Sequence, residues 1–174
     1  MDKKEDGTPP TIQGLQCFSF MKSIACSGFL CLLHFMKNNI TPYIHEAKYY
    51  ETDQMKIIHH SNYIRWLEEA RMDFMAKMGF PYVKMEEYGI LSPVLNVSCN
   101  YRQAVRFGES VSIICKLDFF NGIKMKISYE IWNIEKTILH ATGESMHCFV
   151  TKELKPLSLK KALPDVYQLF LSYL

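Results

Sequence analysis

The middle of the chain shows a hydrophobic pattern with helical spacing. Between Asn62 and Met78, apolar side chains recur every three or four residues, and most charged side chains fall between them. This spacing places the apolar residues on one face of a helix, which we interpret as part of the core rather than as a ligand-binding surface. Gly79 and Pro81 follow directly and predict the end of the helix. The apolar positions are Tyr63, Trp66, Leu67, Ala70, Phe74 and Met78.

The chain on either side of this helix has the pattern of strands. Asn121-Gly122 lies between two apolar segments, which is a strong sequence signal for a hairpin and predicts a type I′ turn. Pro156 and Pro164 are expected to mark the frayed exit of the last strand. After Gly89 the pattern is entirely β, so the fold class is α+β, with one long helix against an antiparallel sheet. The predicted strands cover residues 43–49, 94–101, 110–119, 125–132 and 137–151.

The first 35 residues do not follow these patterns. They begin with a polar stretch and become apolar from Leu15 onward, and Lys22 interrupts the apolar part. The uncharged segment from Ser23 to Met36 is shorter than the ~20 residues that a membrane-spanning helix needs. We therefore expect residues 1–35 to be an extension outside the fold, residues 36–174 to form a single domain, and no stable membrane insertion. A membrane anchor is the less favoured alternative.

Charge and cysteine content exclude two classes of function. Lys and Arg number 20 and Asp and Glu number 18, so the formal charge of +2 does not indicate binding to nucleic acid. The six cysteines form no CxxC pair and have no His or Cys partner at zinc-ligand spacing, so no metal site is expected. The pattern is typical of reduced thiols in a cytoplasmic protein.

The polar loop before the helix contains the best candidate for chemistry. Asp53 precedes the expected helix start, at Ser61 or Asn62, by only a few residues. A carboxylate can attack a carbonyl carbon or activate water, and the free N–H groups at a helix N-terminus can stabilise an oxyanion. A carboxylate in such a loop can equally serve as a turn residue, and residue type alone favours that alternative.

The adjacent residues His59 and His60 lie between this aspartate and the helix. Neighbouring side chains in an extended segment point in opposite directions, and no third metal ligand is in view. We therefore expect one histidine to line the site and the other to pack against the protein.

Several segments carry a resemblance to a known family. Residues 50–71 contain Thr52-Asp53, a hydrophobic pair, His59-His60, Asn62-Tyr63 and a Glu-x-Ala-Arg sequence ending at Arg71. This order resembles the signature of hotdog thioesterases of the 4-hydroxybenzoyl-CoA type. Residues 100–109 and 141–144 are similar to two further features of that family, so the resemblance extends over about residues 40–165.

The resemblance implies a single hotdog domain over residues 36–174, in which an antiparallel sheet of about five strands wraps around one long central helix. It implies hydrolysis of acyl-CoA thioesters, or of acyl-carrier-protein thioesters, without a cofactor. Asp53 matches the catalytic nucleophile or general base, and His60 matches the position whose backbone N–H lies near the thioester. It also implies a homodimer or homotetramer with sites at the subunit interface. Substrate-binding positions would be His59, Asn62, Tyr63 and Lys56.

The chain departs from the family pattern at two positions. Lys56 stands where glycine, which permits a positive φ, is usual, and Gln103 stands where proline is usual. Lys56 could distort the loop or add a cation near an anionic substrate. It is also the best support for a second function, that of a non-catalytic acyl-CoA-binding protein. The third alternative is an enoyl-CoA hydratase or dehydratase of the same fold, which is disfavoured because residues 62–78 contain no histidine.

Overall fold

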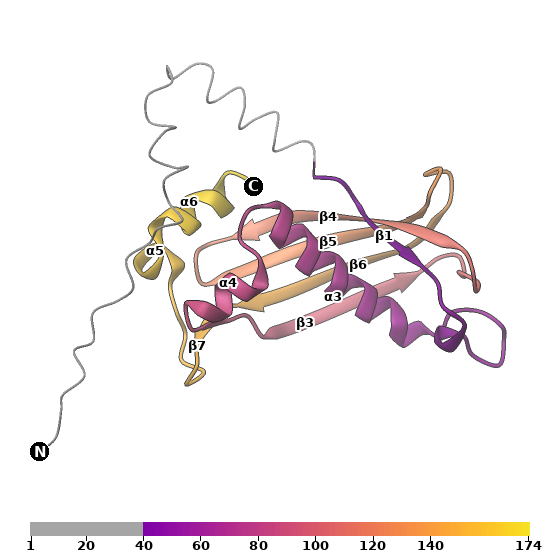
Figure 1. Ribbon diagram of the computed structural model, residues 1–174, viewed down its shortest axis with the longest axis horizontal. Helices are drawn as coiled ribbons and strands as arrows, with labels where there is room; N and C mark the ends of the chain where they lie inside the picture. Colours follow the sequence, from indigo (N-terminus) through magenta and orange to yellow (C-terminus); the bar gives the residue numbers. More distant parts are fainter. Residues whose placement is uncertain (1–39) are drawn as a thin grey trace, which may run out of the picture. The chain divides into compact units, whose positions relative to one another are not determined.

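The computed structural model describes residues 40–174. The extension predicted over residues 1–35 lies outside this range. Within the described part of the chain, no helix is both long enough and apolar enough to cross a membrane. The elements run from the strand β1 (Tyr43–Glu46) to the helix α6 (Pro164–Leu171) (Figure 1).

The predicted long helix is α3, which covers His60–Lys77. It begins one residue before the predicted start because His59, not Ser61 or Asn62, occupies the N-cap. All the predicted apolar positions are buried, so this face belongs to the core as predicted. Met78 is the C-cap and Gly79 follows with φ +96°, a conformation that glycine adopts without steric cost.

A five-stranded antiparallel sheet wraps around α3 (Figure 1). Its strand order is β1-β4-β5-β6-β3, so β1 and β3 form the two edges. Alternate side chains of the central strand β5 are buried, as expected for a strand with one face toward the core. This is the sheet of about five strands around one helix that the sequence predicted. The remaining strands are β3 (Val94–Tyr101), β4 (Ser110–Phe120), β5 (Lys124–Asn133) and β6 (Leu139–Cys148).

The hairpin predicted at Asn121-Gly122 is present, but its turn is not of type I′. A type I′ turn needs positive φ at both central residues, and here Gly122 has φ +85° whereas Asn121 is not among the positive-φ residues. The connection between β4 and β5 spans residues 121–123, and the Asn121 side chain organises it. Asn121 Oδ1 accepts hydrogen bonds from the backbone N–H groups of Ile123 (3.0 Å) and Lys124 (2.8 Å). The side chain thus replaces the backbone geometry that the prediction assumed.

The end of the chain is helical, and the prediction of an all-β region with a frayed exit is wrong there. The helices α5 (Leu159–Ala162) and α6 follow the last strand, and Pro164 occupies the first turn of α6. Proline is well suited to that position because its missing N–H would have no helical partner. Phe170 of α6 is 1% exposed and its ring lies 4.9 Å from that of Phe120, so α6 covers one end of the sheet.

The long strand predicted over residues 137–151 is divided into two strands in the structure. β6 ends at Cys148, and β7 (Val150–Thr151) pairs instead with β2 (Ile90–Leu91) in a separate two-stranded sheet. The helix α4 (Tyr82–Glu87) connects α3 to β2 and was not predicted. These segments are too short to show a clear period in the sequence.

Candidate active site

Asp53 lies on a small closed loop between residues 52 and 58. Thr52 and Ile58 form an antiparallel bridge at the base of the loop. The backbone N–H of Asp53 donates to the carbonyl of Ile57 at 2.9 Å, and the N–H of Lys56 donates to the carbonyl of Asp53 at 3.0 Å. The loop therefore has a defined shape and holds Asp53 just before α3.

The carboxylate of Asp53 is half-buried and has one turn-forming contact. Its Oδ1 accepts a hydrogen bond from the backbone N–H of Met55 at 2.7 Å. This is the turn role that the residue type alone favoured. Because a carboxylate has two oxygens, this contact leaves acceptor capacity for a second role.

Lys56 has φ +60° at the tip of this loop. The conformation is the left-handed one that glycine adopts freely and that costs other residues about 1–2 kcal/mol. The backbone hydrogen bonds across the loop form nevertheless, so the lysine adopts the conformation instead of distorting the loop. Its side chain is exposed to solvent.

A buried carboxylate that the sequence analysis missed lies two residues before Asp53. Glu51 is 5% exposed. Its Oε1 accepts from Trp66 Nε1 at 2.7 Å, and its Oε2 accepts from the backbone N–H of Lys48 at 2.6 Å and lies 3.1 Å from His45 Nε2. Burial alone raises the pKa of Glu51, but the hydrogen bonds from Lys48, Trp66 and His45 outweigh it and hold the pKa below its usual range.

The backbone of Glu51 ties the loop to the start of α3. Its carbonyl accepts hydrogen bonds from the backbone N–H of His59 and from Asn62 Nδ2, both at 2.8 Å. Glu51 therefore joins the strand β1, the Asp53 loop and the N-terminus of α3. The residue lies within the segment that resembles the thioesterase signature, but no spacing rule distinguishes it from an ordinary loop glutamate.

The rings of His59 and His60 lie against each other in a tilted arrangement, with centroids 4.1 Å apart and planes at 36°. The expectation that they point in opposite directions is wrong, because the chain turns from extended into helical conformation between them. His59 caps the helix: its Nδ1 accepts from the backbone N–H of Ser61 at 3.3 Å. Within residues 40–174, no group of three His, Cys, Asp or Glu side chains is arranged to hold a metal.

The N-terminus of α3 is held by the loop at residues 102–109. The backbone N–H of Val105 donates to Tyr63 Oη at 3.1 Å, and its carbonyl accepts from the backbone N–H of Ile58 at 2.8 Å. Tyr101 Oη donates to the carbonyl of His60 at 3.0 Å. The backbone N–H of His60 has no hydrogen-bond acceptor within residues 40–174, as expected for the first turn of a helix.

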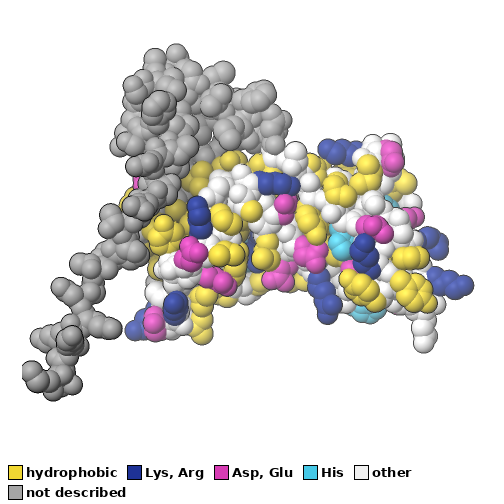
Figure 2. Space-filling view, viewed as in Figure 1, with side chains coloured by type: hydrophobic (Ala, Val, Ile, Leu, Met, Phe, Trp, Pro, Cys, Tyr) yellow, Lys and Arg dark blue, Asp and Glu magenta, His cyan; other side chains and the backbone are white. Residues whose placement is uncertain are grey.

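All six residues that the sequence singled out lie on one segment, from Asp53 to Tyr63. Asn62 and Tyr63 are buried, and their polar groups support the Glu51 carbonyl and the Val105 backbone. Their assignment as substrate-binding residues stays a prediction. Figure 2 shows histidine and Lys or Arg side chains, with exposed hydrophobic ones, at the end of the domain where Figure 1 draws the connection from β1 to α3.

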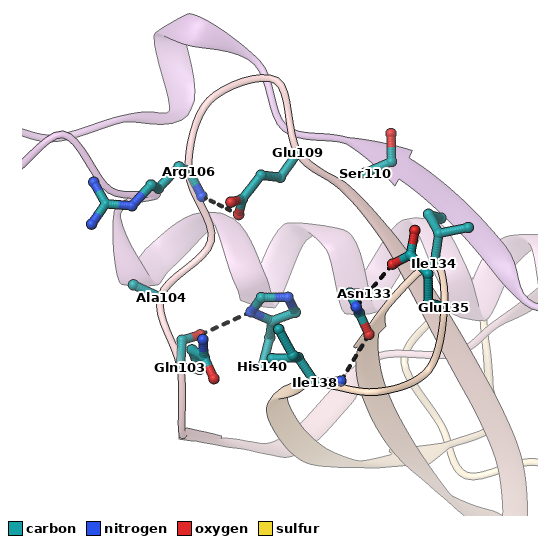
Figure 3. Close-up of a pocket in the computed structure, with 10 residues that line it drawn as sticks. All are labelled: Gln103, Ala104, Arg106, Glu109, Ser110, Asn133, Ile134, Glu135, Ile138 and His140. Atoms are coloured by element: carbon teal, nitrogen blue, oxygen red, sulfur yellow. Dashed lines mark hydrogen bonds between the residues drawn. The ribbon is translucent and has the colours of Figure 1, made fainter.

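A cavity of about 530 Å³ adjoins the loop at residues 102–109 (Figure 3). Its lining includes the carboxylates Glu109 and Glu135 and the single guanidinium of Arg106. Glu109 Oε2 accepts from the backbone N–H of Arg106 at 2.8 Å, and His140 Nδ1 lies 3.2 Å from the carbonyl of Gln103. The lining of this cavity thus carries two carboxylates and one guanidinium, a balance that does not favour an anionic ligand.

Comparisons with known proteins bear on the family of this chain. The sequence profile described as the thioesterase-like superfamily matches residues 48–169. The chain belongs to this superfamily. This thioesterase-like protein is 34% identical over 120 residues to YneP of Bacillus subtilis (strain 168), described as a candidate acyl-CoA thioesterase, with 69% of this chain and 87% of the relative covered.

Two further relatives extend the comparison. The acyl-CoA thioester hydrolase YbgC of Escherichia coli O6:H1 is 22% identical over 66% of this chain and 87% of its own. The crystal structure of DHNA-CoA thioesterase from Staphylococcus aureus superposes with a TM-score of 0.71 and 33% identity, covering 75% of this chain and 87% of that one. The hotdog fold predicted for this thioesterase-like protein is confirmed.

Proposed function

We propose that this protein hydrolyses acyl-CoA thioesters to a free acid and CoA. The observation that carries the proposal is the position of Asp53, on a closed loop that leads directly into the N-terminus of α3. A carboxylate and the free backbone N–H of His60 therefore lie on one short, well-anchored segment. The names of the similar proteins from B. subtilis and S. aureus support the same class of reaction.

In this mechanism the Asp53 carboxylate acts in one of two ways. As a general base it removes a proton from water, the water oxygen bonds to the carbonyl carbon, and the carbon–sulfur bond breaks to release CoA as a thiolate that is then protonated. As a nucleophile it bonds to the carbonyl carbon itself, the carbon–sulfur bond breaks to release CoA as a thiolate that is then protonated, and water hydrolyses the resulting mixed anhydride to the free acid and the Asp53 carboxylate. In both cases the His60 N–H donates to the oxyanion that develops on the carbonyl oxygen, aided by the positive end of the helix.

The substitution Asp53→Asn tests this proposal. Asparagine keeps the Oδ1 acceptor for the Met55 N–H, so the loop is preserved while the base is lost. We expect kcat for release of CoA thiol to fall by about 10²–10⁴-fold with unchanged thermal unfolding. Asp165→Asn, at an exposed carboxylate in α6, is the matched control and should have full activity. Unchanged turnover in Asp53→Asn would contradict the proposal.

Thiol release also distinguishes this function from two alternatives. A non-catalytic acyl-CoA-binding protein would bind the thioester tightly and release no thiol, and its main support was Lys56. Because the loop keeps its hydrogen bonds with Lys56 in place, that support is weakened. A hydratase or dehydratase would consume an enoyl-CoA without thiol release. Within α3, His60 is the only histidine, and it lies at the first position rather than along the helix.

We also propose that the protein is a homo-oligomer in which two β3 strands pair. β3 is an edge strand of eight residues and leaves a row of backbone N–H and C=O groups unpaired. Val94, Leu95 and Tyr101 on this strand are each about half exposed, at 53, 50 and 49%. An exposed apolar edge of this length is covered in stable proteins, and a second copy of the same strand satisfies both the backbone and the apolar side chains. A dimer, or a tetramer of two such dimers, follows.

For the location of the protein we propose the cytoplasm. Cys99, Cys115 and Cys148 are free thiols in the described part of the chain, and each is half-buried. Unpaired cysteines of this kind persist where the compartment is reducing. Acyl-CoA is the expected substrate there, with acyl-carrier-protein thioesters as the second candidate that the same assay can compare.

A further inference from the structure

A second, smaller cavity lies between α3 and the sheet, and its volume is about 60 Å³. Ile64, Leu67, Glu68 and Arg71 line it from α3, and Val97 lines it from β3. The floor consists of Tyr129, Ser145 and His147 on β5 and β6. The cavity therefore has apolar walls at Ile64, Leu67 and Val97 and polar groups on its floor and at Glu68 and Arg71.

Arg71 is a buried cation without a close carboxylate partner. The residue is 3% exposed. Its nearest carboxylate is Glu68, with the nitrogen and oxygen 3.9 Å apart, and its other contacts are Met75 Sδ at 4.0 Å and the ring of Tyr82 at 5.6 Å from the guanidinium carbon. A guanidinium has five N–H donors and matches a carboxylate with two parallel hydrogen bonds. Arg71 thus carries unused donors on a cavity wall.

The opposite wall presents a chain of neutral polar groups. Tyr129 Oη lies 2.7 Å from Ser145 Oγ, which lies 2.7 Å from His147 Nε2. His147 is 1% exposed, and its Nδ1 has no hydrogen-bond partner within the described residues. Burial, together with the charge of Arg71, lowers the pKa of His147 to about 4, so the imidazole is neutral at pH 7. Arg71 is therefore the positive charge that faces a ligand in this cavity, and Glu68 is the carboxylate that opposes it there.

The cavity is aligned with the candidate active site. It follows the same face of α3 over Ile64 to Arg71, and Ile64 lies one turn beyond His60. β3 runs alongside from Tyr101, which bonds to His60, to Val97 at the cavity. A chain that starts at the helix N-terminus and follows this path reaches Arg71 after about 16 Å, at 1.5 Å per residue.

We propose that this cavity receives the far end of the acyl group and that Arg71 selects acyl chains ending in a carboxylate. The inference rests on the proposed thioesterase function and names its substrate class. An extended chain advances about 1.2 Å per bond, because the three backbone bonds of one extended residue span about 3.5 Å. The path is about 11–16 Å, because the Arg71 side chain tilts by up to a turn toward the helix N-terminus. It therefore fits an acyl chain of about 9–13 carbons.

The experiment compares two matched substrate series. One is n-acyl-CoA and the other is the ω-carboxyacyl-CoA of the same length, from 6 to 16 carbons in each, as about the range that brackets the proposed optimum. For the wild-type protein we expect kcat/KM to favour the ω-carboxy substrate about 10- to 100-fold near the optimal length. Arg71→Met should abolish this ratio, and Arg71→Lys should keep part of it because lysine retains the charge without the fork.

Two variants control for general effects. Arg65→Met removes an exposed arginine from the same helix and should leave the ratio unchanged. Glu68→Gln removes the carboxylate nearest to Arg71. Because the Glu68 carboxylate would repel a bound carboxylate, its removal should raise the ratio about two- to fivefold. If Arg71→Met does not fold, the inference is decided by two other measurements. These are the dependence of the wild-type kcat/KM on chain length in both series and the kcat/KM ratio in Glu68→Gln.

Binding separates this inference from the proposed function. The dissociation constants of both series are measured by calorimetry in Asp53→Asn, which is expected to bind without turnover. A carboxylate preference in binding with no hydrolysis by the wild type would contradict the thioesterase function alone. Hydrolysis of both series with equal kcat/KM at every length, or a preference that persists in Arg71→Met, would overturn the inference alone.

Discussion

Glu51 Oε1 accepts a hydrogen bond from Trp66 Nε1 at 2.7 Å, fully inside the protein. Trp66 is 0% exposed and belongs to the core face of α3, whereas Glu51 leads into the loop that carries Asp53. The pair thus connects the hydrophobic core to the candidate catalytic carboxylate. Since the Glu51 carbonyl also binds the backbone of His59, movement of this one residue would shift the whole segment.

The first prediction concerns this support. Glu51→Ala should lower the free energy of unfolding by about 2–4 kcal/mol, because it leaves the N–H groups of Trp66 and Lys48 buried without acceptors. It should also lower kcat more than it raises KM, since Asp53 would lose its orientation. Urea denaturation and steady-state kinetics measure both effects. Glu46→Gln, at an exposed carboxylate of β1, is the control and should change stability by less than about 0.5 kcal/mol. Equal stability losses in the two variants would contradict the role of Glu51.

The second prediction concerns pH. The pKa of His147 is about 4 in the folded protein against 6.5 for the free side chain. Between these values the unfolded chain binds a proton that the folded protein does not, so stability is complete above pH 6.5 and falls as the pH drops toward 4. The loss should be on the order of 2–3 kcal/mol. His147→Gln should remove this pH dependence in urea titrations, and a slope that persists in the variant would assign it to other groups.

The third prediction concerns the left-handed residue of the active-site loop. Lys56→Gly should leave the free energy of unfolding unchanged or raise it by up to about 1 kcal/mol, because relief of the positive φ offsets the greater freedom of glycine in the unfolded chain. Lys56→Val should lower it by about 1–2 kcal/mol and reduce turnover, because a β-branched residue resists this conformation. Lys56→Ala removes the charged side chain but keeps an unbranched Cβ, and so separates the effect of the lysine side chain from that of β-branching. A fully stable Lys56→Val would show that the loop does not need the left-handed conformation.

The fourth prediction concerns the oligomer. Leu95→Glu places a charge on the exposed edge strand β3, and two such charges would meet in a dimer formed by this strand. Light scattering coupled to size-exclusion chromatography should show dissociation to a monomer, with loss of activity if the site needs the second copy. Val83→Glu, at a residue of α4 that is 66% exposed, is the matched control and should keep the oligomer intact. An unchanged mass for Leu95→Glu would exclude β3 as the interface.

The fifth prediction compares two glycines with similar φ. A Cβ at Gly122 would lie 3.0 Å from the ring of Tyr167, whereas a Cβ at Gly108 would meet nothing within 4 Å. Both alanine variants bear the cost of a positive φ, about 1–2 kcal/mol. Gly122→Ala should therefore be the less stable of the two by about a further 1 kcal/mol in urea denaturation. Equal stability would mean that the Tyr167 ring moves aside without cost.

Local patterns predicted the long elements well. The apolar stripe from Tyr63 to Met78 identified α3 because its length covers several helical turns, and β5 follows a clear alternation of buried and more exposed positions. The helix α6 was missed because Pro164 was interpreted as the end of structure, although proline is equally suited to the first turn of a helix. The turn type at Asn121 was wrong because a side chain there replaces a backbone conformation.

The candidate site divides in the same way. The Asp53 to Tyr63 segment could be identified because its residues are contiguous in the sequence. Glu51 and Arg71 could not, because each looks like an ordinary charged residue and owes its importance to burial. Burial depends on contacts with residues that are distant along the chain, such as His45 and Trp66 for Glu51 and Tyr82 for Arg71.

The sequence by itself determined the fold class, the long helix, the five main strands and the position of a carboxylate just before a helix. Periodicity and residue order carry that information because they act over a few neighbouring residues. Only the tertiary structure decided that Glu51 anchors the Asp53 loop, that the rings of His59 and His60 lie against each other, and that Arg71 faces a cavity aligned with the site. These features depend on which side chains are removed from water together, and that is decided by the packing of the whole domain.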